Sequence, residues 1–383
     1  MHLADLPRDV TAPAASGPDD LLAAVRAIAL GPLAQQVQSI DRDGHYPAGI
    51  LKQLAAAGAM SAHLDAPVGA GDFFLAIQAM AQVSRVCGAT GFMMWCQGVC
   101  GLYMQQSGNP ALLGDALARH ASGEALGGTA MSNPMKNYAR IESLLLRAKP
   151  VEGGFIVNGT LPWVSNLGDG HYCGAVAAVL DGETPASREV MFLLRCGAPG
   201  VELRECPSFS AMEGTGTYGI RLKDYFVGAA DLIAEPARPY IARIRAAFVL
   251  LQCGMGTGIT QGAIDSMWDV EARLGHVNQF LDERPDALQA ELDALNGRIR
   301  DLAKTPFDSS VDFFIAVLEA RAHCTELCLR AAQSALLHQG ARGYLMVSPV
   351  QRRVRESHFV AIVTPAIKHL RKEMARLATP AAA

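Results

Sequence analysis

The sequence predicts an α+β protein in which a β-rich middle segment separates two helical regions. Apolar residues recur at helical spacing as far as residue 123, alternate in strand-like fashion up to Pro236, and return to helical spacing after it. We therefore expect an N-terminal helical domain at 19–123, an antiparallel β-domain at 124–236 and a C-terminal four-helix bundle at 237–383. Residues 1–18 contain acidic residues without an apolar run and are expected to form a flexible tail rather than a signal peptide.

The composition excludes several classes of protein. The chain has 383 residues, 18% of them charged, and a formal net charge of −4 without a basic block, which argues against nucleic-acid binding. Its most apolar window, Ala246–Ile264, is interrupted by Gln and Gly and indicates a buried helix rather than a membrane span. Nine cysteines without a CxxC pair favour a reduced, cytoplasmic setting, and we expect them to be small buried hydrophobes rather than metal ligands.

Helical patterns dominate both ends of the chain. Residues 19–59 contain two helical segments, which Asp43-Gly44 and Pro47 separate, and Phe73–Cys87 and Gly88–Ser107 predict two more. After Pro236, four helices are expected, broken by Pro306, Gly340, Gly343 and Pro349. They are Ile241–Leu274, Pro285–Lys304, Ser309–Gln339 and Pro365–Leu377. The GxGxG run at Gly254–Gly258 lies inside a helical pattern without a preceding strand, so close helix packing is expected there and not a dinucleotide loop.

Strand signals are concentrated in the middle of the chain. The stretch Gly123–Ala175 has turn signals at Gly153-Gly154 and Asn158-Gly159, which predict hairpins. Further strands are expected in Tyr172–Leu180, Glu189–Cys196, Val201–Glu205 and Thr217–Val227.

Three short motifs in this middle region resemble a known family. Ser132-Asn133-Pro134, the GGFIVNG run at Gly153–Gly159 and the WVSN run at Trp163–Asn166 resemble the middle β-domain of acyl-CoA dehydrogenases. The resemblance implies an FAD-dependent oxidoreductase, with FMN the less favoured cofactor, that acts on the CH–CH bond of an acyl-CoA or similar thioester. It also implies a homotetramer or dimer with FAD between subunits, and a redox partner, either an electron acceptor or a flavin reductase.

The resemblance also assigns roles to individual residues. Ser132 stands where the family bonds the pyrimidine edge of the flavin, Ser165 stands where a hydroxyl bonds N5, and Trp163 would pack beside the ring. The turn Gly340–Tyr344 is similar to the family's turn near the adenine half of FAD, so Gly340 and Arg342 are expected to bind the cofactor. Met131, Lys136 and Arg140 are the expected substrate-binding residues.

Several positions depart from the family pattern. Asn133 replaces a Glu, the loop Met135–Arg140 lacks the usual glycines, and no Arg-x-Phe-Gly motif occurs around Val277–Pro285. The catalytic carboxylate is missing from both of its usual places, which correspond to Ile362–Thr364 and to the neighbourhood of Phe248.

Other residues are therefore candidates for the acid or base. They are Thr364, His358 and His369, with His171 as a further histidine. A reduced-flavin-dependent monooxygenase of the same fold tolerates the loss of the carboxylate and stays an alternative, as does a redox-inactive binding scaffold.

Overall fold

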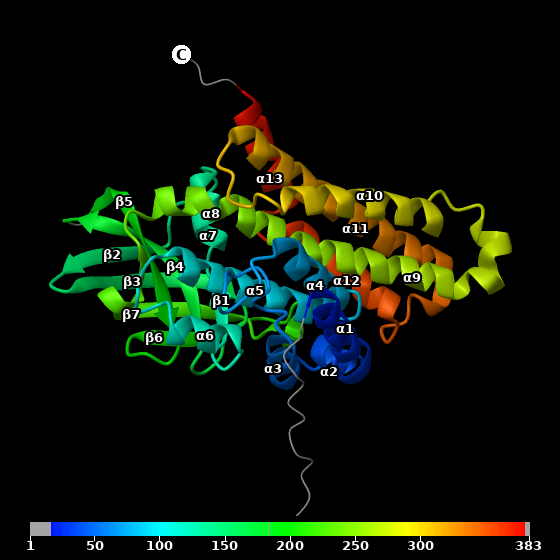
Figure 1. Ribbon diagram of the computed structural model, residues 1–383, viewed down its shortest axis with the longest axis horizontal. Helices are drawn as coiled ribbons and strands as arrows, with labels where there is room; N and C mark the ends of the chain where they lie inside the picture. Colours follow the sequence, from blue (N-terminus) through cyan, green and yellow to red (C-terminus); the bar gives the residue numbers. More distant parts are fainter. Residues whose placement is uncertain (1–16, 183, 380–383) are drawn as a thin grey trace, which may run out of the picture.

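The computed structural model (Figure 1) describes residues 17–182 and 184–379. The predicted tail at residues 1–18 falls mostly outside the described residues, and the first helix begins at Pro18. A β-domain occupies one end of the elongated molecule and the long C-terminal helices extend to the other, with the N-terminal helices packed against their junction (Figure 1). The predicted fold class is confirmed.

The N-terminal helices surround one central, buried helix. In that helix, α5 (Gly88–Gln106), every residue from Gly88 to Met104 is buried, because the sequence there is apolar or small on all sides. Pro32 lies within a short π-helical turn, η1 (Ala29–Leu33), since proline cannot donate the usual helical hydrogen bond. The other helices are α1 (Pro18–Ile28), α2 (Ala34–Arg42), α3 (Ala48–Ala56), α4 (Phe73–Ser84) and α6 (Asp115–Ala121).

The β-domain is one mixed sheet with the order β6-β7-β3-β2-β4-β5-β8, and β1 pairs with β4. The expectation of a purely antiparallel sheet needs correction, because β4 runs parallel to both β1 and β2. The chain crosses over after β3 and returns β4 beside β2 instead of forming another hairpin. The elements are β1 (Gly127–Thr129), α7 (Ser132–Tyr138), β2 (Leu146–Val151), β3 (Gly154–Val164), β4 (Tyr172–Asp181), β5 (Thr184–Arg195), β6 (Val201–Glu205), η2 (Glu213–Thr215), β7 (Tyr218–Gly228), η3 (Ala229–Asp231) and β8 (Leu232–Ala234).

Two local predictions in this domain are wrong. Gly153-Gly154 joins β2 and β3, but Asn158-Gly159 lies inside β3 at a shift in register, with Gly159 at φ +140°. A bulge uses the same Asn-Gly chemistry as a turn, so the local signal is ambiguous. The predicted loop Met135–Arg140 is largely helical, because α7 extends to Tyr138.

The C-terminal helices form the expected bundle, with one change of membership. The four bundle helices are α9 to α12, which pack against one another, and the predicted Pro365–Leu377 helix is the additional helix α13. Helix α12 is not among the predicted helices. Pro349, an expected break, begins this helix, where its missing N–H costs nothing. The elements are α8 (Ala237–Leu251), α9 (Cys253–Asn278), α10 (Pro285–Leu302), α11 (Val311–Gln339), η4 (Gly340–Arg342), α12 (Pro349–Ile362) and α13 (Ile367–Ala378).

The glycine run at the start of α9 allows close helix packing, as predicted. A Cβ on Gly256 would lie 2.4 Å from the Cys324 sulfur, and one on Gly258 would lie 2.3 Å from the Ala81 carbonyl oxygen. The segment Ala237–Asn278 is long and apolar enough to cross a membrane, but 94% of its most apolar window is buried inside the structure. It is therefore a core element of the fold, as expected for Ala246–Ile264. Eight of the nine cysteines are buried, in agreement with the prediction that they act as small hydrophobes.

Candidate functional site

Two hydroxyls join the β-domain to the C-terminal helices at the start of α7. Ser132 is the first residue of α7, and its Oγ lies 2.9 Å from Thr364 Oγ1 in the connection between α12 and α13. The Gln252 side-chain amide donates to the Thr364 carbonyl oxygen at 2.9 Å and holds this connection against the α8–α9 junction. The tertiary fold thus places an expected cofactor residue, Ser132, beside one of the candidate acid/base residues, Thr364.

The segment that carries Trp163 and Ser165 is held beside β1. Asn166 donates to the Gly127 carbonyl oxygen at 2.7 Å, and a Cβ on Gly128 would lie only 2.3 Å from the Ser165 carbonyl oxygen. Because Gly128 precedes Ser132 by four residues, all three expected flavin-ring residues lie on neighbouring segments.

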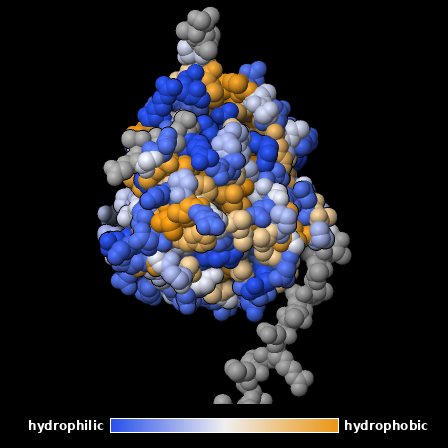
Figure 2. Space-filling model, turned by 90° about the vertical axis from the view of Figure 1, so that its left-hand side faces the viewer, coloured by the Kyte–Doolittle hydropathy of each residue, from blue (hydrophilic) through white to orange (hydrophobic). Residues whose placement is uncertain are grey.

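The two side chains differ in their surroundings. Trp163 is 62% exposed and has φ +51°, whereas Ser165 Oγ lies 2.6 Å from Thr217 Oγ1. Exposed apolar side chains such as Trp163 and Phe226 belong to the β-domain, and the end of the molecule at which this domain lies carries hydrophobic patches among hydrophilic ones (Figure 2).

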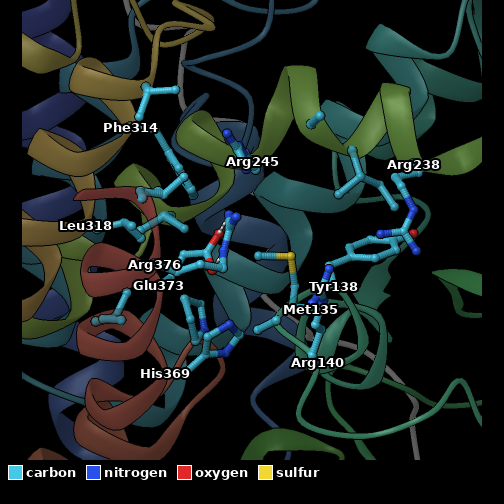
Figure 3. Close-up of a pocket in the computed structure, with 18 of the residues that line it drawn as sticks. Met135, Tyr138, Arg140, Arg238, Arg245, Phe314, Leu318, His369, Glu373 and Arg376 are labelled. Atoms are coloured by element: carbon cyan, nitrogen blue, oxygen red, sulfur yellow. Dashed lines mark hydrogen bonds and ion pairs between the residues drawn. The ribbon is translucent and has the colours of Figure 1, made fainter. Parts of the chain in front are cut away.

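A pocket is lined by residues that are close in the chain to Ser132 and Thr364. Its volume is about 920 Å³, within the range of small-molecule sites. Met135 and Tyr138 of α7 and Pro365, which follows Thr364, contribute to its wall. Further walls come from α8, α11 and α13, and their larger apolar side chains are Ile241, Val249, Val311, Phe314, Leu318, Leu370 and Leu377. Figure 3 shows these elements enclosing the space from opposite sides.

His369 of α13 lies in the pocket wall with both ring nitrogens unpartnered among the described residues. The side chain is only 6% exposed, and its Nδ1 is buried without a hydrogen-bond partner. Burial lowers the pKa of His369, although the nearby Glu373 carboxylate acts in the opposite direction. The neutral imidazole in the pocket wall therefore keeps a nitrogen lone pair that can accept a proton.

Four arginines and one glutamate also line the pocket. Arg376 binds Glu373 through two hydrogen bonds of 2.6 and 2.8 Å, and Arg238 binds Glu189 at 2.5 Å. Arg245 lies with its guanidinium carbon 3.9 Å from the centre of the Phe314 ring. Arg140 follows α7 at φ +54° and is exposed. The pocket thus combines an aliphatic wall with an excess of positive charge (Figure 3).

Of the residues expected to bind substrate, the structure brings only Arg140 into this pocket. Met131 is 2% exposed and packs in the hydrophobic core. The Lys136 ammonium lies 3.5 Å from Glu142 in a partly exposed ion pair. Neither residue lines the pocket: Met131 precedes α7, and Lys136 is next to Met135 on this helix and so faces another direction.

Other predicted residues lie outside the pocket. His358 is exposed on α12, and the ring of His171 is held at 3.0 Å by the Asn166 carbonyl oxygen. Gly340 follows Leu318, the last pocket residue of α11, by 22 residues, and a rise of about 1.5 Å per residue puts it about 33 Å from that residue along the helix. Gly340 and Arg342 therefore do not converge with Ser132 within one chain.

Sequence reasoning missed Arg245, Glu373 and Arg376. A signal for Arg245 exists, because it stands between Ile241 and Val249 at intervals of four and so interrupts an apolar row on α8. His369 and Glu373 have the same spacing on α13 and both face the pocket. Which apolar rows face a cavity is decided by helix packing, which the spacing alone does not specify.

Comparisons with known proteins agree on one family. The sequence profile described as "Acyl-CoA dehydrogenase, N-terminal domain" matches residues 18–124. The chain is 25% identical over 354 residues to mitochondrial isovaleryl-CoA dehydrogenase of Oryza sativa subsp. japonica, which covers 86% of this chain and 83% of that protein. It is 22% identical to the probable acyl-CoA dehydrogenase YngJ of Bacillus subtilis, over 88% of this chain and 91% of that protein.

Solved structures show the same fold. Butyryl-CoA dehydrogenase from Megasphaera elsdenii superimposes with a TM-score of 0.82 at 16% identity, over 97% of this chain and 99% of that chain. A glutaryl-CoA dehydrogenase from Mycobacterium smegmatis in complex with FADH2 superimposes with a TM-score of 0.76 at 17% identity, over 96% and 95% of the two chains.

Proposed function

We propose that this chain, which belongs to the acyl-CoA dehydrogenase family, is an FAD-dependent oxidoreductase that acts on an acyl-CoA or a similar thioester. One observation carries the proposal: the wall of the pocket of about 920 Å³ includes Pro365, which follows Thr364 in the chain, and residues of α7, the helix that Ser132 begins. Ser132 begins α7, and Met135 and Tyr138 of the same short helix form the pocket wall. A substrate in the pocket would therefore lie next to the expected flavin edge.

The residues present fit a flavin ring. Ser132 is exposed, so its hydroxyl can exchange its bond to Thr364 for one to a ligand, and the Trp163 indole has 62% of its surface free to pack against a ring. Ser165 adds a hydroxyl on the neighbouring segment. Ser132, Trp163 and Ser165 would hold the isoalloxazine, and bound flavin supplies a hydride acceptor for the β-carbon of the substrate.

His369 is the proposed proton acceptor. The resemblance implies a carboxylate within Ile362–Thr364 or near Phe248, and neither place has one. Phe248 is buried against Trp95. The neutral ring of His369 can remove the proton from the α-carbon of the thioester, which leaves electron density to form the α,β double bond as hydride departs. The apolar wall excludes water from the developing charge.

Binding of the adenine half of FAD by Gly340 and Arg342 would require a second copy of the chain. Because Gly340 and Arg342 lie about 33 Å or more along α11 from its last pocket residue, Leu318, they would serve an adenine half only across a homo-oligomer. The Asn278 side chain donates to the His338 carbonyl oxygen at 3.3 Å and joins the ends of α9 and α11. Exposed apolar residues surround this junction, namely Val277, Phe280, Leu337, Tyr344, Leu345, Met346 and Val347. We call them the bundle-end patch and propose that it contacts a second copy.

A flavin spectrum and anaerobic reduction test the function. The purified protein, or the protein loaded with FAD, is expected to show a bound-flavin spectrum that acyl-CoA thioesters bleach without oxygen. A protein that binds no flavin would contradict both enzyme hypotheses and leave the binding scaffold. Bound flavin that no thioester in a chain-length panel bleaches would exclude the dehydrogenase, and oxygen-dependent product formation with reduced flavin would then identify the monooxygenase, which the missing carboxylates favour.

The role of His369 is tested with a matched pair of variants. His369→Gln is expected to slow flavin bleaching by about 10²- to 10⁴-fold with an unchanged flavin spectrum. His358→Gln changes an exposed histidine of α12 and should leave the rate intact. Equal rates for the two variants would remove His369 from the reaction. The redox partner and the cytoplasmic setting stay predictions from the sequence.

A further inference from the structure

Arg140 and Arg245 differ from the other pocket arginines in their partners. Arg238 and Arg376 each bind a carboxylate directly. Among the described residues, neither the Arg140 nor the Arg245 guanidinium makes a hydrogen bond or an ion pair, although both line the same cavity. Within the described part of the chain, Glu373 is the one carboxylate in the pocket wall, and it already accepts two hydrogen bonds from Arg376.

Holding the charged Arg245 guanidinium at this partly buried position costs free energy when no ligand is bound. The guanidinium is only partly exposed, and burial lowers its pKa, with Glu373 opposing this and Arg376 adding to it. The Phe314 ring stabilises the cation through its face. That contact leaves the five N–H donors of the guanidinium plane unused, so they can bind an oxyanion bidentately.

The rest of the wall indicates what the oxyanion is attached to. Ile241 and Val249 lie one helical turn on either side of Arg245 on α8, and Leu318 lies one turn after Phe314 on α11. An aliphatic chain can therefore occupy the pocket while its charged group reaches the arginines. Arg140 approaches from the end of α7, on the other side of the cavity from α11 (Figure 3).

We infer that Arg140 and Arg245 form an oxyanion subsite, so that the substrate of this pocket is a thioester whose bound part carries a carboxylate or a phosphate. The identification of the ligand as a thioester rests on the proposed function. The subsite itself rests on two unpaired guanidiniums facing one aliphatic cavity. A carboxylate would belong to the acyl group, and a phosphate to the carrier arm of the thioester.

Binding measurements on four ligands separate these sources. Flavin-loaded protein is titrated calorimetrically, without oxygen, with butyryl and glutaryl thioesters of CoA and of N-acetylcysteamine, which lacks phosphate. The variants are Arg245→Met, which keeps an apolar stem over Phe314, and Arg140→Gln. Arg243→Met is the control, because Arg243 lies on the same helix, donates to the Gln106 carbonyl oxygen at 2.9 Å and does not line the pocket.

Each result has a distinct meaning. An acyl-carboxylate site predicts that Arg245→Met weakens both glutaryl ligands about tenfold or more and leaves both butyryl ligands unchanged. A phosphate site predicts the same loss for both CoA thioesters and none for the two phosphate-free ligands. Affinities that change no more than in Arg243→Met, for all four ligands and both variants, would overturn the inference. Flavin bleaching is recorded separately, so ligands that bind through the arginines without bleaching would count against the proposed function and not against the subsite.

Discussion

Lowering the pH from 7 to 5 is expected to destabilise the fold through two buried histidines, His63 and His120. They are 3% and 0% exposed, and burial lowers the pKa of each to about 4. His120 Nε2 faces the Gln97 carbonyl oxygen at 2.8 Å, so it must donate, and Nδ1 accepts from the Tyr172 hydroxyl at 2.7 Å. Protonation of Nδ1 would remove this acceptor and place an unpaired charge between α5, α6 and β4.

The size of the effect follows from proton linkage. Because each pKa falls from 6.5 to about 4 on folding, the unfolded chain binds more protons in this interval, and stability is lost as the pH falls through it. At pH 5 each histidine should cost about 2 kcal/mol relative to pH 7. The two together, about 4 kcal/mol, are a large part of the 5–15 kcal/mol typical of a folded domain.

Urea unfolding at pH 7 and pH 5 measures this loss. His120→Gln is expected to be less stable than the wild type at pH 7, but to lose about 2 kcal/mol less between the two pH values. Glu356 has the opposite effect on the wild type: burial raises its pKa, so its contribution to the free energy of unfolding grows as the pH falls. The comparison between variants cancels this term. If the pH-dependent loss of His120→Gln equals that of the wild type and of the exposed-site variant His358→Gln, the linkage argument fails.

Three further predictions concern the cofactor site and the assembly. Gly128→Ala should destabilise the protein by about 1–3 kcal/mol and weaken flavin binding, because the new Cβ would lie 2.3 Å from the Ser165 carbonyl oxygen. The control in denaturation and flavin titration is Gly49→Ala, since a Cβ on Gly49 would have no atom within 4 Å. Trp163→Ala should lower flavin affinity with little change in melting temperature, since the side chain is 62% exposed; unchanged affinity would exclude it from the site. Phe280→Asp, at an 82% exposed position of the bundle-end patch, should shift sedimentation toward smaller species, and an unaltered profile would place the interface elsewhere.

Local chemistry in the chain was enough to predict the fold class and the expected flavin-ring residues. Alternating residues and the Gly153-Gly154 turn indicated the β-domain, and the motifs around Ser132 and Trp163 indicated a family and its cofactor. Errors arose where one local signal permits two structures. The Asn-Gly pair is a bulge in β3 and not a turn, and Pro349 begins a helix that it was expected to interrupt.

Only the tertiary structure forms the pocket and brings its charged side chains together. Ser132 and Thr364 are 232 residues apart and lie within 2.9 Å, and the pocket takes its walls from α7, α8, α11 and α13. The sequence determined that His358, His369 and Thr364 were the candidates for the missing base, because it contains no carboxylate at the usual positions. Only the packing of α13 against α11 buried His369 and left His358 in solvent, since burial and proximity arise between elements and not within them.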